Sequence, residues 1–208
     1  MNILLVDDHA VVRKGLRQVL AEELSGPSFG EVGSAAGLQQ ALHGRTWDLV
    51  ILDLNLPDRH GLEVLKDLKT RHPALPVLVF SLYPEAHYAT RAIKAGAAGY
   101  LSKDSAPEDL AAAVEKVLSG GKFVTSALGE QLAHELGRPA STASFKPSDR
   151  ELQILRLIAE GHTLAEIADR LALSAKTVST YRSRLLDKLR LRTTADLIRY
   201  AIESRLIG

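Results

Sequence analysis

The first 120 residues alternate short apolar runs with stretches in which apolar residues recur at helical spacing. This pattern predicts strands at residues 3–6, 31–35, 49–52, 77–81 and 99–101. It predicts helices at residues 11–24, 38–43, 62–71, 86–95 and 107–118. The third and fourth strands are almost wholly apolar, which is typical of strands buried on both faces of a parallel sheet. Five such units in order predict an α/β domain with a five-stranded, doubly wound parallel sheet.

From Ser148 onward the pattern is helical throughout. Ser148 followed by Glu151 is a capping-box signature, and it predicts a helix that runs to about Glu160, with Gly161 just beyond its end. Further helices are expected at residues 164–171, 176–189 and 194–202. Two helices joined by a tight turn, the second basic and polar on its exposed face, are typical of a helix-turn-helix. The sequence therefore predicts a second, smaller all-α domain.

Between these regions lies a stretch typical of a linker. Gly120 and Gly121 end the fifth helix, and residues 137–147 are rich in Pro, Ser, Thr, Ala and Gly without apolar periodicity. We therefore expect a first domain over residues 1–120 and a second over residues 146–208. Residues 121–145 are expected to form the linker, with a short helix near residues 128–135.

Composition narrows the class of protein. The 208 residues include 46% apolar and 25% charged side chains, which is ordinary for a soluble globular protein. The absence of cysteine excludes disulfides, thiolate metal sites and a cysteine nucleophile. No apolar run is long enough to span a membrane, and the first ten residues do not resemble a signal peptide. A cytoplasmic location without a membrane partner is the resulting expectation.

Charge is distributed unevenly along the chain. Residues 146–208 hold 12 Lys and Arg against 8 Asp and Glu, a net charge of +4. Residues 1–145 hold 14 against 17, a net charge of −3. A basic C-terminal region suggests a polyanionic partner, although many solvated helices carry a similar balance.

Polar side chains gather where the predicted strands end. Asp7 and Asp8 follow the first strand, Asp53 follows the third, Ser81 ends the fourth and Lys103 follows the fifth. The carboxyl ends of parallel strands meet at one edge of a sheet, so these side chains are expected to lie together. Three carboxylates at one place repel each other and favour a hard cation such as Mg²⁺. An Asp nucleophile can then form an aspartyl phosphate, with the hydroxyl and the ammonium binding phosphoryl oxygens.

The segments ILLVDDHAVVRKGL, LVILDLNLPDRHGLEVL and VLVFSLYPEAHYATRAIKAGAAGYLSKD carry a specific resemblance. They resemble the flavodoxin-like receiver domain of two-component response regulators over about residues 1–120. The resemblance implies that a sensor histidine kinase phosphorylates Asp53. It implies that Mg²⁺ is bound by Asp7, Asp8, Asp53 and the backbone carbonyl of Asn55. It also implies that phosphate binding and switching involve Ser81, Tyr100 and Lys103.

A second resemblance is carried by the segment SDRELQILRLIAEGHTLAEIADRLALSAKTVSTYRSRLLDKLRLRTTADLIRYAI. It resembles the LuxR/FixJ-type helix-turn-helix over roughly residues 146–205, so the whole chain is similar to response regulators of the NarL/FixJ family. This resemblance implies a regulator of transcription rather than an enzyme, active as a homodimer on double-stranded promoter DNA when phosphorylated. The predicted helix over residues 176–189 is expected in the major groove. Its expected DNA contacts are Lys176, Thr177, Ser179, Thr180, Arg182, Ser183, Arg184 and Lys188.

Some positions depart from the common family pattern. Arg59 and His60 add cationic character beside the acidic pocket, although a solvated loop is the simpler interpretation, and Leu82 is larger than usual. All seven His residues, which show no metal-ligand spacing, are expected in loops or on the surface.

Two other chemical functions fit the acidic pocket less well. A nucleotide-binding domain is disfavoured because the first βα loop has no Gly-rich phosphate cradle. A phosphatase with an Asp nucleophile needs a second acid two residues later, where Asn55 stands. A regulator that binds DNA without phosphorylation and a protein-binding scaffold stay open.

Overall fold

The computed structural model describes residues 1–126, 128–130, 147–204 and 206–207. The chain separates into two compact units, residues 1–133 and residues 134–208. Each unit is described by itself.

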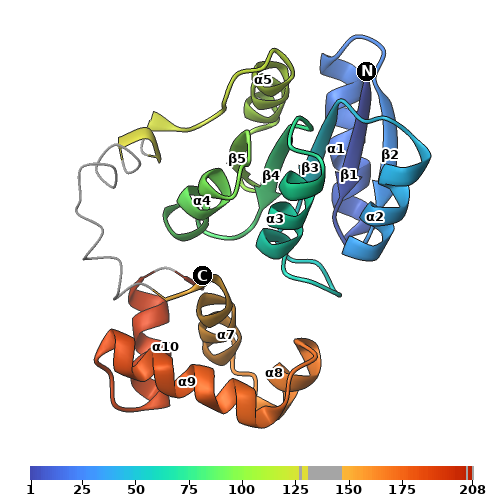
Figure 1. Cartoon of the computed structure of the whole chain (residues 1–208). Helices are drawn as coiled ribbons and strands as arrows, with labels where there is room; N and C mark the ends of the chain where they lie inside the picture. The colour runs from blue at the N-terminus through green and yellow to red at the C-terminus, as the bar shows by residue number, and fades with distance from the viewer. Residues whose placement is uncertain (127, 131–146, 205, 208) are drawn as a thin grey trace. The chain divides into compact units, whose positions relative to one another are not determined.

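The first unit is built on a parallel sheet (Figure 1). Its strands are β1 (Asn2–Val6), β2 (Ser28–Val32), β3 (Leu49–Leu52), β4 (Val77–Ser81) and β5 (Gly99–Ser102). They lie in the order β2-β1-β3-β4-β5. Because β1 lies between β2 and β3, the order reverses there, and such a switch point is where parallel sheets place their binding sites. The predicted five-stranded, doubly wound parallel sheet is confirmed.

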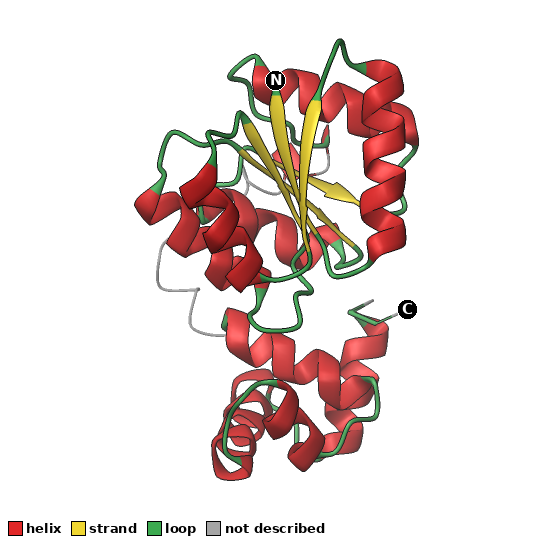
Figure 2. Ribbon diagram, turned by 90° about the vertical axis from the view of Figure 1, so that its right-hand side faces the viewer, coloured by secondary structure: helices red, strands yellow, loops and turns green. Residues whose placement is uncertain are grey.

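Helices cover both faces of this sheet (Figure 2). They are α1 (Ala10–Glu23), α2 (Ala35–Gly44), α3 (Gly61–Arg71), α4 (Glu85–Lys94) and α5 (Pro107–Leu118). Successive residues of a strand point to opposite faces, so each strand supplies both sides of the core. One face of the sheet packs against α1 and α5, with the buried side chains of Leu16, Leu20, Leu110, Val114 and Val117.

The second strand begins and ends three residues earlier than its predicted range of residues 31–35. It spans Ser28–Val32, in register with β1, where Asn2 pairs with Ser28 and Val6 with Val32. Ser34 instead caps α2, because its hydroxyl accepts a hydrogen bond from the Gly37 N–H at 3.1 Å. An edge strand with few apolar residues gives a weak pattern, so its position depends on pairing with β1.

The second unit consists of helices: α7 (Asp149–Ala159), α8 (Leu164–Arg170), α9 (Ala175–Leu189) and α10 (Thr194–Glu203). The predicted capping box of Ser148 and Glu151 is present. Gly161 follows α7 with a φ of 88°, a left-handed conformation that glycine adopts without strain. The tight turn between α8 and α9 includes Ala172. The next residue, Leu173, donates its N–H to the Ala168 carbonyl at 2.9 Å. The helix-turn-helix expected from the sequence is thus the observed arrangement of α8 and α9.

The predicted linker lies largely outside the described residues. Of the short helix expected near residues 128–135, Leu128, Gly129 and Glu130 are described, and they are helical. Among the residues that the structure describes, no helix has the length and apolar character needed to cross a membrane.

Candidate functional site

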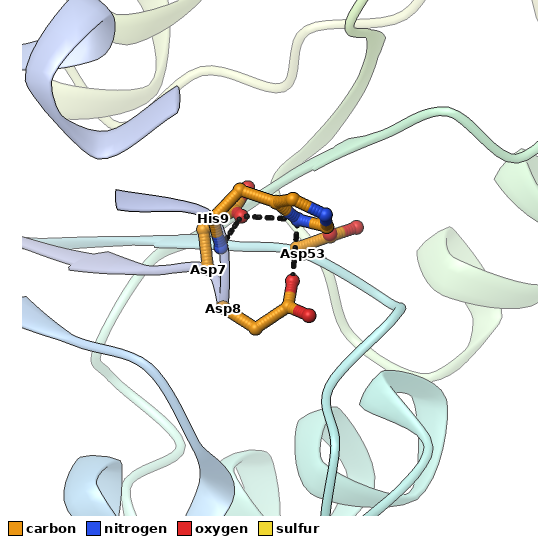
Figure 3. Close-up of side chains that lie close together, drawn as sticks. All are labelled: Asp7, Asp8, His9 and Asp53. Carbon is orange, nitrogen blue, oxygen red and sulfur yellow. Dashed lines mark hydrogen bonds and ion pairs between the residues drawn. The ribbon is translucent and has the colours of Figure 1, made fainter. Parts of the chain in front are cut away.

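The acidic residues converge at the carboxyl edge of the sheet. Val6 and Leu52 are paired in the register of β1 and β3, so the next residues, Asp7 and Asp53, lie side by side. The two side chains are only 2% and 3% exposed. Figure 3 shows them with Asp8 and His9, and one ligand atom from each of the four lies within 4.8 Å of the others. Parallel pairing of two strands therefore places three carboxylates in one pocket.

Both carboxylate oxygens of Asp53 have partners from later strands. The Ser81 hydroxyl donates to Oδ1 at 2.7 Å, and the Lys103 ammonium donates to Oδ2 at 2.7 Å. The same ammonium lies 2.5 Å from Oδ2 of Asp7. Ser81 is fully buried at the end of β4, and Lys103 follows β5 with its N–H donating to the Ser81 carbonyl at 3.0 Å. The structure thus brings the predicted side chains into direct contact.

Charge in this pocket is unbalanced. Burial lowers the pKa of Lys103, but the nearby carboxylates of Asp53 and Asp7 outweigh burial and raise it above its usual value. Lys103 is therefore a cation at neutral pH, and it faces two buried carboxylates and the partly exposed Asp8. One positive charge does not neutralise three carboxylates, and hard oxygen ligands suit Mg²⁺. The donor set therefore fits a divalent cation.

His9 lies in a loop and is exposed, as expected, and it also belongs to this cluster although the His residues show no metal-ligand spacing in the sequence. Its ring Nδ1 lies 2.6 Å from Oδ1 of Asp8, and its backbone N–H donates to Oδ1 of Asp7 at 2.8 Å. Its side chain is 59% exposed, so it covers the acidic turn from the solvent side. The sequence signal was its position directly after the acidic pair.

Tyr83 links the pocket to Tyr100, a contact that sequence reasoning missed. The fully buried Tyr100 hydroxyl donates to the Tyr83 carbonyl at 2.5 Å. The Tyr83 N–H donates to the Ser81 hydroxyl oxygen at 3.4 Å, and its own hydroxyl donates to Oδ1 of Asn55 at 3.3 Å. Burial raises the pKa of Tyr100, with the nearby Tyr88 and Asp53 adding to the effect, so its hydroxyl stays a neutral donor.

The loop after Asp53 is held by its own contacts. The Asp58 carboxylate accepts hydrogen bonds from the Ala35 and Ala36 N–H groups, both at 2.9 Å, and so caps α2. Burial alone raises the pKa of Asp58, but these backbone donors outweigh burial and lower it. The loop returns to the sheet at Gly61, whose N–H donates to the Leu54 carbonyl at 2.9 Å.

The structure corrects two expectations for this loop. His60 is 4% exposed rather than on the surface, and its ring packs against Tyr83 and Tyr88, with centroid distances of 5.8 and 6.3 Å. Arg59 does not add its charge to the acidic pocket, because it forms an ion pair with Asp67 on α3 at 2.8 Å.

The second candidate surface is one side of α9. The exposed side chains among the predicted DNA contacts recur at spacings of three and four residues, which places them on one helix face. They are Lys176, Thr180, Ser183 and Arg184. Thr177 and Ser179 are half-buried beside this face.

Arg182 and Lys188, also half-buried, have partners within the unit. The Arg182 guanidinium donates to the Thr194 hydroxyl at the start of α10, at 3.3 Å. The Lys188 ammonium donates to Oε2 of Glu151 at 2.7 Å, and Glu151 is 2% exposed. These two cations therefore join α9 to its neighbouring helices.

Both units of the chain match known protein families. The profile described as "Response regulator receiver domain" matches residues 3–115. The profile described as "Bacterial regulatory proteins, luxR family" matches residues 148–201. The chain belongs to the NarL/FixJ-type response regulators. This response regulator is thus of a transcription-factor family, not an enzyme family, as expected from the sequence.

Full-length relatives share both domains. The response regulator is 39% identical over 210 residues to the transcriptional activator protein ExaE of Pseudomonas putida, covering 100% of this chain and 98% of that protein. It is 37% identical over 191 residues to the DNA-binding transcriptional activator DevR/DosR of Mycobacterium tuberculosis, covering 91% and 88%. Among solved structures it is similar to RcsB from Salmonella enterica serovar Typhimurium bound to promoter rprA in the presence of phosphomimetic beryllofluoride. That match has a TM-score of 0.72 and 26% identity, and covers 96% of this chain and 98% of the other.

Proposed function

We propose that this response regulator accepts a phosphoryl group on Asp53 from a sensor histidine kinase and that phosphorylation changes its affinity for double-stranded promoter DNA. The observation that carries the proposal is the contact of Asp53 with both the Ser81 hydroxyl and the Lys103 ammonium, beside Asp7. Each oxygen of the Asp53 carboxylate accepts a hydrogen bond from one of these donors. The same two donors can therefore bind the anionic oxygens of a phosphoryl group attached to Asp53. Because DNA and such a kinase's phosphorylated domain are the partners, a cytoplasmic location is part of the proposal.

Phosphoryl transfer uses the Asp53 carboxylate as nucleophile. A carboxylate oxygen bonds to phosphorus while the bond from phosphorus to the kinase's imidazole nitrogen breaks, and that nitrogen keeps the electron pair. Ser81 then donates to a phosphoryl oxygen, and Lys103 pairs with another. Neither group has to travel far, because both already contact Asp53. The product is stable because the Asn55 amide, two residues on, cannot act as acid or base.

The carboxylates of Asp7, Asp8 and Asp53, with the backbone carbonyl of Asn55, would hold Mg²⁺ in this pocket. When bound, the ion neutralises carboxylates and phosphoryl oxygens together. Lys103 alone leaves a net negative pocket, so the donor set supports this proposal.

DNA recognition is proposed for the exposed face of α9. Lys176 and Arg184 would contact phosphate or guanine, and Thr180 and Ser183 would contact base edges. Thr177 and Ser179 flank this face, whereas Arg182 and Lys188 would position the helix through Thr194 and Glu151. A phosphorylated homodimer would read two half-sites about one turn of DNA apart, roughly 34 Å.

The test measures both halves on the full chain. Asp53→Asn should abolish the mass increase of one phosphoryl group after incubation with Mg²⁺ and a small-molecule phosphodonor. Asp48→Asn, at the opposite end of β3, is the matched control and should be phosphorylated normally. Transfer to Asp53→Asn would refute the assignment.

DNA selection from genomic fragments, with and without beryllofluoride, tests the second half. Binding that beryllofluoride leaves unchanged would instead support a regulator that works without phosphorylation. Binding with a shallow salt dependence would support a protein-binding scaffold. Steady turnover of generic phosphoesters would support a phosphatase.

A further inference from the structure

A narrow cavity of about 80 Å³ lies between α2 and α3 of the receiver. Its walls are aliphatic side chains from both helices, Leu38 and Leu42 on α2 and Val64 and Leu68 on α3. Leu38, Val64 and Leu68 are buried, whereas Leu42 is half-buried. Apolar side chains that face a gap lack packing partners on one side, so a ligand that fills the gap gains those contacts.

Polar contacts hold the two helices together at the end of the cavity where both begin. The Asp58 carboxylate, just before α3, accepts from the Ala35 and Ala36 N–H groups at the start of α2. Arg59, which lines the cavity, pairs with Asp67 at 2.8 Å. Both helices follow parallel strands, so both run back toward the opposite edge of the sheet. The far end of the cavity therefore lies where α2 and α3 end.

This far end is cationic. Arg71, the last residue of α3, and His72, directly after it, line the cavity together with His43 from the last turn of α2. All three side chains are exposed, and Arg71 forms no ion pair within the described part of the chain. Because Asp67 neutralises Arg59, the lining carries one unbalanced positive charge apart from its imidazoles.

The size and charge of the cavity indicate the class of ligand. Val64 and Arg71 are seven residues apart on α3, a distance of about 10 Å along the helix. In another protein a benzene ring fills a cavity of about 150 Å³, and this cavity has about half that volume. An unbranched carbon chain therefore fits better than a ring. One carboxylate matches both the single unbalanced charge and the planar guanidinium of Arg71.

We propose that this cavity binds an unbranched aliphatic carboxylate of medium length. The carboxylate would pair with Arg71, and the chain would lie between Leu42, Val64 and Leu68. The chain supplies most of the affinity, because each methylene removed from water is favourable. The guanidinium selects the head group. Binding at this site requires no phosphorylation, so it goes beyond the proposed function.

An NMR titration of the full chain with hexanoate tests the site. The methyl resonances of Leu42, Val64 and Leu68 should shift along a saturable curve. The indole N–H of Trp47 is a second reporter, because it donates to the Ala41 carbonyl on α2 at 3.0 Å. That carbonyl belongs to the residue before Leu42, so a chain bound in the cavity should move this resonance as well.

Three further compounds test the chemistry of recognition. Butanoate is two methylenes shorter and should bind about 5- to 15-fold more weakly than hexanoate. Hexanol and hexylamine keep the chain and replace the carboxylate with a neutral or a cationic group. Each should bind at least about 5-fold more weakly than hexanoate.

Three variants locate the site. Leu42→Phe places a ring in the cavity and should abolish the shifts caused by hexanoate. Arg71→Met keeps an unbranched side chain without the charge, so it should weaken hexanoate about 5-fold and leave hexanol unchanged. Arg17→Met, at an exposed arginine on α1, is the matched control and should bind hexanoate normally. Thermal melts check that each variant is folded, and Arg71→Met decides the result if Leu42→Phe is not.

The outcomes are distinct. Saturable shifts that Arg71→Met weakens and Arg17→Met leaves unchanged support the site. Shifts that do not saturate, or that persist in folded Leu42→Phe, overturn it. Hexylamine that binds as tightly as hexanoate overturns the recognition of a carboxylate. None of these results alters the phosphorylation of Asp53, which is measured separately by mass.

Discussion

Replacing Lys188 with Met tests whether this lysine stabilises the DNA-binding domain or contacts DNA. Its ammonium lies 2.7 Å from Oε2 of Glu151, whose side chain is 3% exposed, whereas the Lys188 side chain is 34% exposed. Burial raises the pKa of Glu151, but Lys188 and Ser148 outweigh burial and lower it, so the carboxylate is charged at neutral pH. Lys188→Met would leave that charge buried without its cation.

The expected cost follows from these exposures. Removing one partner of a fully buried pair costs about 3–5 kcal/mol, and an exposed pair contributes at most about 1 kcal/mol. Because solvent reaches one partner, we expect a loss of about 2 kcal/mol. In a domain of this size that lowers the Tm by roughly 8–16 °C. The control Glu151→Gln removes the charge itself and should cost less.

Calorimetry of the full chain measures this loss. Trp47, the single tryptophan, lies in the receiver, so its fluorescence identifies the unfolding transition of the receiver. The second transition in the calorimetric scan is then assigned to the DNA-binding domain. A group with a lowered pKa stabilises the fold above its unfolded pKa and loses this effect as pH falls through the folded value. The difference between the unmodified chain and Lys188→Met should therefore close as pH falls below about 4.5.

Salt dependence of DNA binding completes the test. Each phosphate contact contributes about 0.9 to the slope of log affinity against log salt. Lys176→Met should lower the slope by about this amount, because Lys176 is exposed. Lys188→Met should leave the slope unchanged. A loss of slope in Lys188→Met with an unchanged Tm would refute the structural role and assign Lys188 to phosphate.

Three further predictions concern the receiver. Lys103→Met should lower the Tm of the receiver without Mg²⁺, by removing the cation that faces the buried carboxylates, and added Mg²⁺ should restore most of the loss in thermal melts. Asp58→Ala removes two hydrogen bonds that cap α2 and should lower the free energy of unfolding, measured in urea, by about 1–2 kcal/mol. Because the pKa of Asp58 is lowered, the stability that its carboxylate contributes should be lost as pH falls below about 3.8. Gly61→Ala would place a Cβ 2.6 Å from the backbone oxygen of Asp53 and closer still to Leu54. It should therefore destabilise by about 1–3 kcal/mol and weaken beryllofluoride binding measured by fluorescence. Gly44→Ala, with open space around it, should do neither.

Much of the receiver fold could be predicted because its signals are local. The almost wholly apolar β3 and β4 can only be buried, and parallel pairing then brings Asp53 and Ser81 to one edge. The capping box of Ser148 and Glu151 likewise needs only residues three apart. Predicted bounds for α5 match the observed Pro107–Leu118. Where the signal was weak, as in β2, the prediction was displaced toward Ser34.

Contacts between residues far apart in sequence could not be predicted. Asp58 caps α2 from 22 and 23 positions away, and Lys188 reaches Glu151 across 37. Residue type and helical periodicity placed Lys188 among the expected DNA contacts, and they do not show that its ammonium pairs with Glu151.

The chain's own pattern therefore determined two domains, the parallel sheet and the acidic edge, because periodicity, caps and strand order are encoded within a few residues. Tertiary structure alone decided which cations of α9 stay exposed and how Tyr83 bridges Asn55 and Tyr100. It also decided where Thr125 meets Glu85. Such pairings depend on how whole helices and strands pack against each other. Many side chains contribute to the free energy of that packing, so no single position in the sequence reveals it.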